Sequence, residues 1–352
     1  MRVSVDKFGV TPQNEQVDIV TIESDNGSYI KLTNYGAKLV ALVVPDSEGR
    51  LDDIVLGYNT LDGYLAGNRF FGSNPGRYAN RIKGAQFTID GVTYKLPANE
   101  GENLLHGGEK AFDGVIWSYE IQENSVSFQY LSPDGENGFP GALDTTITYR
   151  WTKDFKLIID YRATTSKPTH VNLTHHSYFN LDGEGAGSIA DHKITIDASH
   201  YLEVGEGLIP TGRYLSVDGT PLDLRHEQRI GDVADSEFPA IKSALGFDHC
   251  YVLDHKDEAT SHCAHVFSPI SGRTMDVFTT LPGLQFYSCN HVASEVAGKS
   301  GVGYPIRSSL CLEPQFFPNT PNIGTFPSTF LVPNQEYNQT IIYQFSFKTT
   351  RL

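Results

Sequence analysis

The sequence has 352 residues, and its 27 lysines and arginines against 42 aspartates and glutamates give a formal net charge of −15 at pH 7. A chain this acidic, with no Lys/Arg cluster to offset the charge, is a poor partner for nucleic acid or for an anionic membrane surface. Hydrophobic residues make up 39% of the sequence, so the chain can form a core and is not disordered by composition.

The length exceeds the ~100–200 residues of a typical domain, but no repeat and no Pro/Ser-rich linker divides the sequence. The glycine-rich stretch at 183–188 is too short to serve as a linker, so we expect a single domain over residues 1–352. The longest apolar run, 39–44, is far shorter than the ~20 residues needed to cross a bilayer. The N-terminal residues contain no apolar segment typical of a secretory signal. We therefore expect a cytoplasmic protein without a membrane partner.

Alternation of polar and apolar residues predicts strands along most of the chain. These predicted strands cover residues 17–23, 125–130, 145–149, 156–164, 192–198 and 340–349. An Asp-Gly pair at 90–91 predicts a type I′ hairpin between 86–89 and 92–96, and a Ser-Gly pair at 271–272 predicts a looser one between 265–269 and 273–280. Helical patterns are confined to short turns near 60–65 and 232–238. Many short strands, with 33 glycines and 18 prolines between them, indicate an all-β sandwich or barrel.

Several kinds of chemistry lack their motifs. The glycines at 183–187 do not have the GxGxxG spacing of a dinucleotide site, and neither a GxxxxGK[ST] loop nor a GxSxG elbow occurs. His262 and His265 would point to opposite faces of a strand, and no HExxH pattern is present. The four cysteines (250, 263, 289 and 311) have no CxxC spacing, so we expect no zinc site and no disulfide framework, and we interpret each cysteine as a small buried hydrophobe.

Six polar segments combine Arg, Asn, His, Asp, Gln or Glu with aromatic residues and with Gly or Pro. They are GRYANRI (76–82), NLLHGG (103–108), NLTHHSYFNL (172–181), GFDH (246–249), PGLQFY (282–287) and CLEPQ (311–315). Sugar hydroxyls need paired donors and acceptors of these types, and flat rings can pack on the apolar face of a sugar. The segments therefore favour a site for a polyhydroxylated ligand.

In this order, the six motifs resemble the aldose 1-epimerase (galactose mutarotase) family over nearly the whole chain. The resemblance implies an antiparallel β-supersandwich with very little helix and an open sugar cleft. It also implies interconversion of the α and β anomers of free hexoses such as galactose and glucose, by ring opening, rotation and reclosure. Neither a cofactor nor a metal is implied.

The resemblance further assigns roles to residues of the motifs. Glu313 would be the base at the C1 hydroxyl, and His176 would be the acid that protonates the ring oxygen. We expect the two on opposite sides of the C1–O5 unit, with burial raising the pKa of Glu313 and a neighbouring group keeping His176 protonated. The residues implied to bind the sugar hydroxyls are Asn80, Arg81, His106, Asp248 and Gln285.

Two positions depart from the family pattern, since His175 stands where many members carry Asn and Pro314 where others often carry Thr. His175 adds a titratable ring beside the proposed acid and leaves the pH optimum open. Alternative functions are epimerisation of a hexose 6-phosphate, non-catalytic sugar binding, or action on a polysaccharide. A phosphate would need extra cations, and only Arg77, Arg81 and Lys83 cluster near the first motif, so we favour a neutral monosaccharide. We expect a monomer or a weak homodimer.

Overall fold

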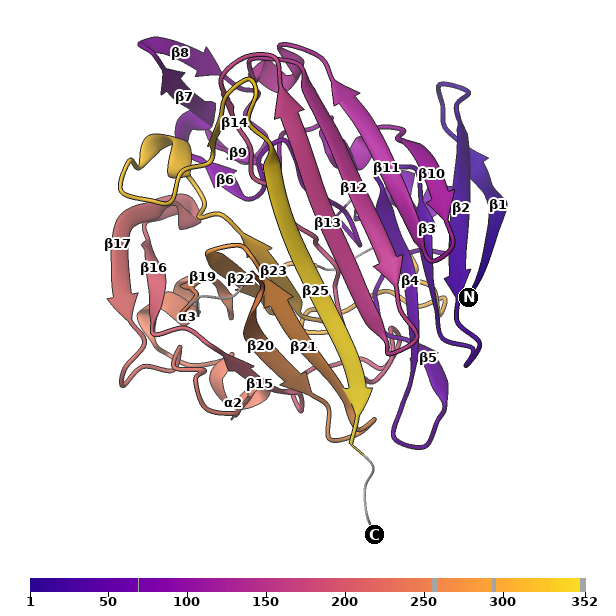
Figure 1. Ribbon diagram of the computed structural model, residues 1–352. Coiled ribbons are helices and arrows are strands. Elements are labelled where there is room, and N and C mark those ends of the chain that lie inside the picture. The colour runs from indigo at the N-terminus through magenta and orange to yellow at the C-terminus, as the bar shows by residue number, and fades with distance from the viewer. Residues whose placement is uncertain (69, 255–258, 293–295, 349–352) are drawn as a thin grey trace.

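The computed structural model describes residues 1–68, 70–254, 259–292 and 296–348 (Figure 1). Strands dominate it, which confirms the all-β prediction. Helices in the described residues are limited to α1 (Leu61–Ala66), α2 (Ile230–Val233) and α3 (Pro239–Ser243). The turn expected near 60–65 is α1. The turn expected near 232–238 overlaps α2 only at residues 232–233, and a second helix, α3, begins directly after the segment, because Pro239 can begin a helix but cannot continue one.

The large sheet has nine strands in the order β10-β11-β12-β13-β25-β21-β20-β15-β18. Its strands are β10 (Ser118–Gln122), β11 (Ser125–Ser132), β12 (Leu143–Trp151), β13 (Lys156–Thr165), β25 (Tyr337–Phe347), β21 (Arg273–Thr279), β20 (Ser261–Phe267), β15 (Lys193–Ile196) and β18 (Gln228–Arg229). Figure 1 shows β11, β12, β13 and β25 side by side across the molecule. Five of the six strands predicted by alternation lie in this sheet; residue 349, the end of the last one, lies outside the described residues.

Two five-stranded sheets accompany the large sheet. The N-terminal sheet contains β1 (Arg2–Val10), β2 (Gln16–Glu23), β3 (Tyr29–Thr33), β4 (Lys38–Pro45) and β5 (Leu51–Asp53). The site sheet, in the order β17-β16-β19-β22-β23, contains β17 (Pro210–Ser216), β16 (His200–Val204), β19 (Asp248–Val252), β22 (Gly283–Tyr287) and β23 (Cys311–Gln315). The two-stranded pairs are β6 (Arg81–Ile82) with β9 (Leu104–Leu105), β7 (Gln86–Ile89) with β8 (Val92–Lys95), and β14 (Thr169–His170) with β24 (Phe330–Leu331). The paired strands of these sheets run antiparallel.

Both predicted hairpins form. Between β7 and β8, Asp90 and Gly91 have φ values of 50° and 79°, the two left-handed residues that a type I′ turn requires. The second hairpin joins β20 and β21. In β20 the register shifts between His262 and Ala264, so His262 and His265 both reach Asp276, at 3.2 and 2.8 Å. The prediction that these two histidines point to opposite faces is wrong, because a bulge breaks the two-residue period.

One hydrophobic cluster joins the three larger sheets. It includes Leu32 from the N-terminal sheet, Ile147 and Tyr343 from the large sheet, and Leu284 from the site sheet, all fully buried. Burying a large apolar side chain stabilises a fold by roughly 1.5–3 kcal/mol, so this shared core holds the site sheet rigidly against the large one. All four cysteines are buried and free, as their interpretation as small hydrophobes requires.

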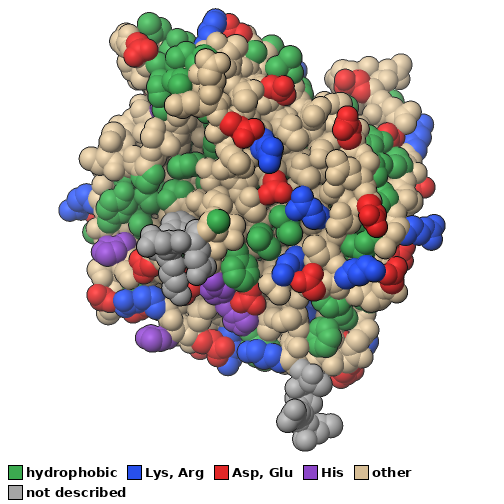
Figure 2. Space-filling view, viewed as in Figure 1, with side chains coloured by type: hydrophobic (Ala, Val, Ile, Leu, Met, Phe, Trp, Pro, Cys, Tyr) green, Lys and Arg blue, Asp and Glu red, His purple; other side chains and the backbone are tan. Residues whose placement is uncertain are grey.

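Charged side chains of both signs are mixed on one face of the molecule. On the face shown in Figure 2, Lys and Arg side chains alternate with Asp and Glu, and the described residues form no continuous basic block there. Within the described ranges, no helix is long and apolar enough to cross a bilayer.

Candidate active site

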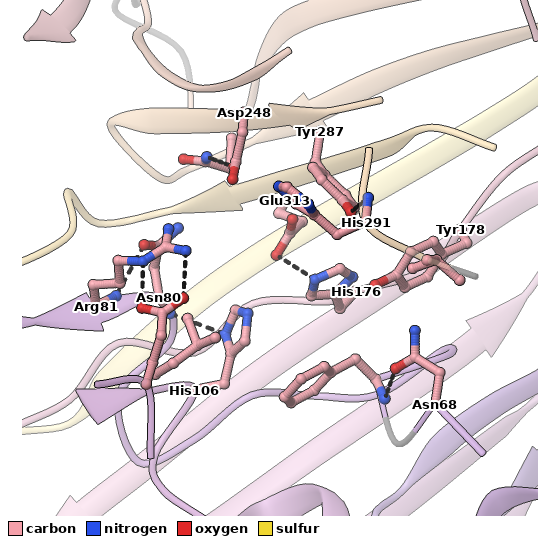
Figure 3. A pocket seen from close by; sticks show the side chains of 15 residues that line it. Asn68, Asn80, Arg81, His106, His176, Tyr178, Asp248, Tyr287, His291 and Glu313 are labelled. Atoms are coloured by element: carbon pink, nitrogen blue, oxygen red, sulfur yellow. Dashed lines mark hydrogen bonds and ion pairs between the residues drawn. The ribbon is translucent and has the colours of Figure 1, made fainter. Parts of the chain in front are cut away.

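A pocket of about 320 Å³ lies at the edge of the site sheet (Figure 3). All seven residues that the sequence predicts for the site line it. Its lining consists of Asn68, Phe70, Asn80, Arg81, Glu100, Leu105, His106, His176, Tyr178, Asp248, Gln285, Tyr287, His291, Val292 and Glu313. The volume falls in the range of ~300–1,000 Å³ for small-molecule sites, near its lower end.

Three of the seven residues come from neighbouring strands of the site sheet. Gln285 on β22 lies directly opposite Glu313 on β23, and Asp248 on β19 is paired with Tyr287, two residues from Gln285. Residues directly opposite, or two positions along, share a face of an antiparallel sheet. The register therefore brings Asp248, Gln285 and Glu313 to one face, where Gln285 Nε2 donates to Asp248 Oδ1 at 2.6 Å.

Asn80 and His106 hold each other in place beside the short β6–β9 pair. The backbone N–H of His106 donates to the carbonyl oxygen of Asn80 at 3.1 Å, and the backbone N–H of Asn80 donates to His106 Nδ1 at 3.0 Å. An imidazole whose Nδ1 accepts a hydrogen bond carries its proton on Nε2. His106 therefore presents an Nε2–H donor to the pocket.

Arg81 is fixed by Glu100, a residue that the motifs do not single out. Arg81 Nε and Nη2 each bond one carboxylate oxygen of Glu100 at 2.6 Å. The two side chains retain 12% and 34% of their exposure. This two-point contact sets the plane of the guanidinium and leaves its remaining N–H groups available to a ligand.

His176 comes from an extended segment that is held by isolated bridges, one of them between Ser73 and His176. Side chains of an extended segment alternate in direction, so His176 and Tyr178 face the pocket while His175 turns toward the core. There His175 Nε2 lies 2.6 Å from the Ser177 hydroxyl, and burial lowers the pKa of His175 to about 3. The imidazole of His175 is thus neutral at physiological pH and outside the pocket, so it adds no second titrating ring beside His176.

Glu313 and His176 meet at the bottom of the pocket, where Glu313 Oε2 lies 3.6 Å from His176 Nε2. They are 2% and 5% exposed. Burial raises the pKa of Glu313 well above its usual range, and the nearby Asp248 carboxylate acts in the same direction while Arg81 opposes it. The raised pKa agrees with the expectation for a buried base.

Two expectations about this pair need correction. Glu313 and His176 lie side by side, and their 3.6 Å contact is too short for the expected arrangement on opposite sides of the C1–O5 unit. In addition, burial lowers the pKa of His176 to about 3, and the positive charge of Lys38 acts in the same direction. Sequence reasoning could not anticipate this, because the depth of a side chain below the surface depends on segments far away in the chain.

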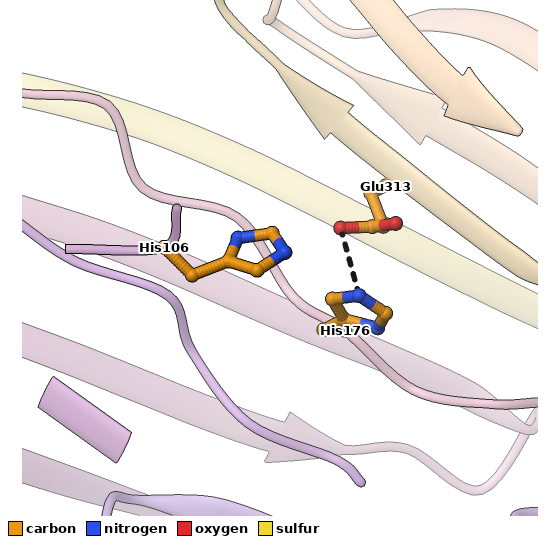
Figure 4. A group of neighbouring side chains, drawn as sticks. All are labelled: His106, His176 and Glu313. Carbon is orange, nitrogen blue, oxygen red and sulfur yellow. Dashed lines mark ion pairs between the residues drawn. The ribbon is translucent and has the colours of Figure 1, made fainter. Parts of the chain in front are cut away.

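His106, His176 and Glu313 are also the single group in the described chain whose possible metal-ligand atoms all lie within 4.8 Å of one another (Figure 4). Two imidazoles and a carboxylate match a catalytic zinc set by type. However, a ligating nitrogen must be free of its proton, and His106 carries its proton on the nitrogen that faces the pocket. Moving that proton to Nδ1 would break the bond from the Asn80 N–H, so the three residues do not fit a metal.

The pocket contains further residues that sequence reasoning missed. Tyr178 and Tyr287 lie inside two of the quoted motifs, two positions from His176 and Gln285, and the strand period alone could have indicated them. Glu100 and Phe70 had no such signal, because each reaches the pocket from a loop.

Comparison with known proteins agrees with this geometry. The model of the aldose 1-epimerase family matches residues 18–344. The chain belongs to the aldose 1-epimerase family. It is 43% identical to the galactose mutarotase of Bos taurus over 97% of this chain and 94% of that protein. It is 37% identical to the aldose 1-epimerase of Escherichia coli K12, with 96% and 97% of the two chains covered.

A solved structure of an aldose epimerase homologue from C. elegans superimposes with a TM-score of 0.86 at 32% identity, covering 93% of this chain and 98% of that one. Family membership confirms the predicted fold and the epimerase class of enzyme.

Proposed function

We propose that this protein interconverts the α and β anomers of free galactose and glucose, with Glu313 and His176 as its catalytic pair. The observation that carries the proposal is the 3.6 Å contact between a buried carboxylate and a buried imidazole at the bottom of a pocket lined by hydroxyl-binding side chains. Anomer exchange needs one proton removed from the C1 hydroxyl and one delivered to the ring oxygen, and a positioned base and acid supply both.

The side-by-side arrangement suits this reaction. The C1 hydroxyl oxygen and the ring oxygen are bonded to the same carbon, so the groups that serve them must also be neighbours. Glu313 takes the hydroxyl proton while His176 Nε2 donates to the ring oxygen, and the C1–O5 bond breaks. After rotation about C1–C2, the protonated Glu313 returns a proton and neutral His176 accepts one as the ring closes on the other face.

In the protein alone, burial favours a neutral His176 and a protonated Glu313. The reactive form has the same single proton on His176 instead, so the bound sugar must favour this arrangement. Glu313 as carboxylate stabilises the imidazolium at 3.6 Å. A sugar bound in the pocket displaces water from the pair and strengthens that attraction. Each positioned acid or base contributes roughly 10²–10⁴-fold to the rate, which suits a reaction that already proceeds slowly in water.

The other predicted residues bind the sugar in this proposal. Arg81, held by Glu100, and the Nε2–H of His106 donate to hydroxyls or to the ring oxygen. Asp248 accepts from hydroxyls, and Gln285 orients it through their 2.6 Å hydrogen bond. Asn80 contributes chiefly by holding the His106 ring, because its backbone N–H fixes the tautomer.

Charge around the pocket favours neutral sugars over hexose 6-phosphates. The guanidinium of Arg77 is buried and bonds Ser132 Oγ and the carbonyl oxygens of residues 132, 133 and 141. Lys83 lines an adjoining basin of about 760 Å³ together with Glu100, Glu102 and Glu206. A phosphate there would meet more carboxylates than cations.

Three further properties belong to the same proposal. The first is a single domain over the chain, supported by the core cluster that the sheets share. The second is a reducing, cytoplasmic location, supported by the four free cysteines. The third is a monomer or a weak homodimer. A non-catalytic sugar-binding protein would not need the buried acid and base together.

Polarimetry tests the central claim. Freshly dissolved α-galactose, α-glucose and α-glucose 6-phosphate are followed with and without protein. We expect acceleration for the two free hexoses and little for the phosphate. Equal or faster turnover of the phosphate would favour the phosphorylated substrate, and no acceleration of any sugar would refute the epimerase proposal.

A further inference from the structure

Aromatic rings surround the imidazole of His176. The ring of Tyr178 has its centroid 4.9 Å away with an interplanar angle of 17°, and that of Phe70 lies at 6.0 Å and 16°. His106 stands nearly perpendicular, at 5.2 Å and 75°. In Figure 3, His176 lies between His106 and Tyr178. Tyr178 reaches this position because it follows His176 by two residues in an extended segment.

The proposed acid needs a stabilised positive charge, yet its surroundings offer few polar partners. Its Nδ1 is buried without a hydrogen-bond partner in the described part of the chain. In many sites where an imidazolium forms, a carboxylate accepts a hydrogen bond from the second ring nitrogen. Here no described carboxylate does so, and Glu313 approaches only on the Nε2 side. Some other group must therefore favour the protonated ring.

We propose that Phe70 and Tyr178 are positioning residues whose ring faces stabilise the imidazolium form of His176 and fix the direction of its Nε2–H. The inference rests on the proposed acid role of His176. The face of an aromatic ring is negative, so a cation over it is attracted, most strongly where water is excluded. Near-parallel stacking also restricts rotation of the imidazole, which keeps Nε2 directed toward Glu313 and the sugar.

Other charged and titratable groups around His176 are the same in every variant considered below. Glu313 on β23 favours the protonated ring, whereas Lys38 on β4 disfavours it. His106 packs against it from the loop after β9. His175, the preceding residue, is neutral and faces the core. If removing one aromatic ring changes the pKa of His176, the change therefore measures the effect of that ring on the imidazolium.

Two matched pairs of variants separate ring chemistry from packing. Phe70→Leu and Tyr178→Leu remove a ring face, whereas Phe70→Tyr and Tyr178→Phe keep it. Phe87→Leu removes a buried ring from the β7–β8 hairpin, outside the pocket lining, and controls for a general loss of packing. The pKa of His176 is measured by NMR titration of the histidine ring protons in the sugar-free protein, and thermal melting identifies any variant that does not fold.

We expect each leucine variant to lower the pKa of His176 by about one pH unit, since a desolvated cation–π contact has an energy of that order. The ring-keeping variants and Phe87→Leu should stay within a few tenths of the wild-type value. In polarimetry, the alkaline limb of the kcat profile, which reports the sugar complex, should move to lower pH by the same amount in the leucine variants, because the acid must be protonated there.

An unchanged His176 pKa in the leucine variants that fold would overturn the proposal, as would an equal fall in the ring-keeping variants. If one leucine variant does not fold, the pair at the other position decides. The titration needs no sugar, so its result is independent of activity. Failure of the wild-type protein to turn over hexoses would instead refute the proposed function.

Discussion

Glu100 provides a sharp test of how the pocket holds its substrate. The residue does not belong to the predicted site, but both of its carboxylate oxygens bond Arg81 at 2.6 Å. Replacing it with alanine leaves the guanidinium on a flexible side chain that must be ordered whenever a sugar binds. A hydrogen bond to a charged group contributes ~1.5–3 kcal/mol when buried. Because Glu100 is 34% exposed, we reduce the two-point contact to about 1–2 kcal/mol in total.

That free energy corresponds to a rise in KM of roughly 5–30-fold, at about 1.4 kcal/mol per factor of ten. The effect should fall on KM rather than kcat, because the proposed role of Arg81 is to bind the sugar and not to transfer the proton. Polarimetric initial rates over a range of galactose concentrations separate the two constants. Glu100→Gln keeps a single acceptor and should lie between wild type and Glu100→Ala. Glu102→Ala, in the same loop but outside the catalytic pocket, is the control and should behave as wild type.

An unchanged KM in Glu100→Ala would show that Arg81 needs no support from this carboxylate. A fall in kcat at constant KM would refute the reasoning in another way, by placing Arg81 in the chemical step.

Three further predictions concern the catalytic pair, metal dependence and pH stability. Glu313→Gln and His176→Asn should each lower kcat by at least about 10²-fold with a modest change in KM, as loss of a transition-state group does; near-normal polarimetric rates in either variant would contradict its role. Prolonged dialysis against EDTA should leave the rate unchanged, because His106 presents a protonated nitrogen to the pocket; lasting inactivation that zinc reverses would reinstate a metal. Finally, the hydrogen bond to Asp276 raises the pKa of His262. Burial alone would raise the pKa of Asp276, but its hydrogen bonds with His262 and His265 outweigh burial and lower it. The cluster therefore stabilises the fold most between the ordinary pKa of Asp, ~3.9, and that of His, ~6.5. Asp276→Asn should lower the free energy of unfolding by about 1 kcal/mol between those pH values, and the difference should shrink as the pH rises through the folded pKa of His262; a deficit that does not change with pH would contradict the cluster's titration.

The β elements were predictable because their rules act over a few residues. Alternation of apolar side chains predicted the strands that became β12 and β13, and the Asp-Gly pair at 90–91 predicted a turn whose two residues both have positive φ. The bulge in β20 was not predicted, because the local sequence contains no signal for it. Its one extra residue reverses the direction of every side chain that follows.

Family motifs named the seven site residues, but they could not supply the distances between them. The sequence by itself determined which side chains are able to act as acid, base or hydroxyl-binding group, because side-chain type decides what a group can donate or accept, and the family resemblance assigned the proposed roles among them. Only the tertiary structure decided that Glu313 and His176 are neighbours, that Glu100 holds Arg81, and that Phe70 stacks near the acid. Those facts depend on segments far apart in the chain meeting in one place. The tertiary structure also decides which groups are protonated, because a pKa depends on how deeply folding buries a group and on which charges folding places beside that group.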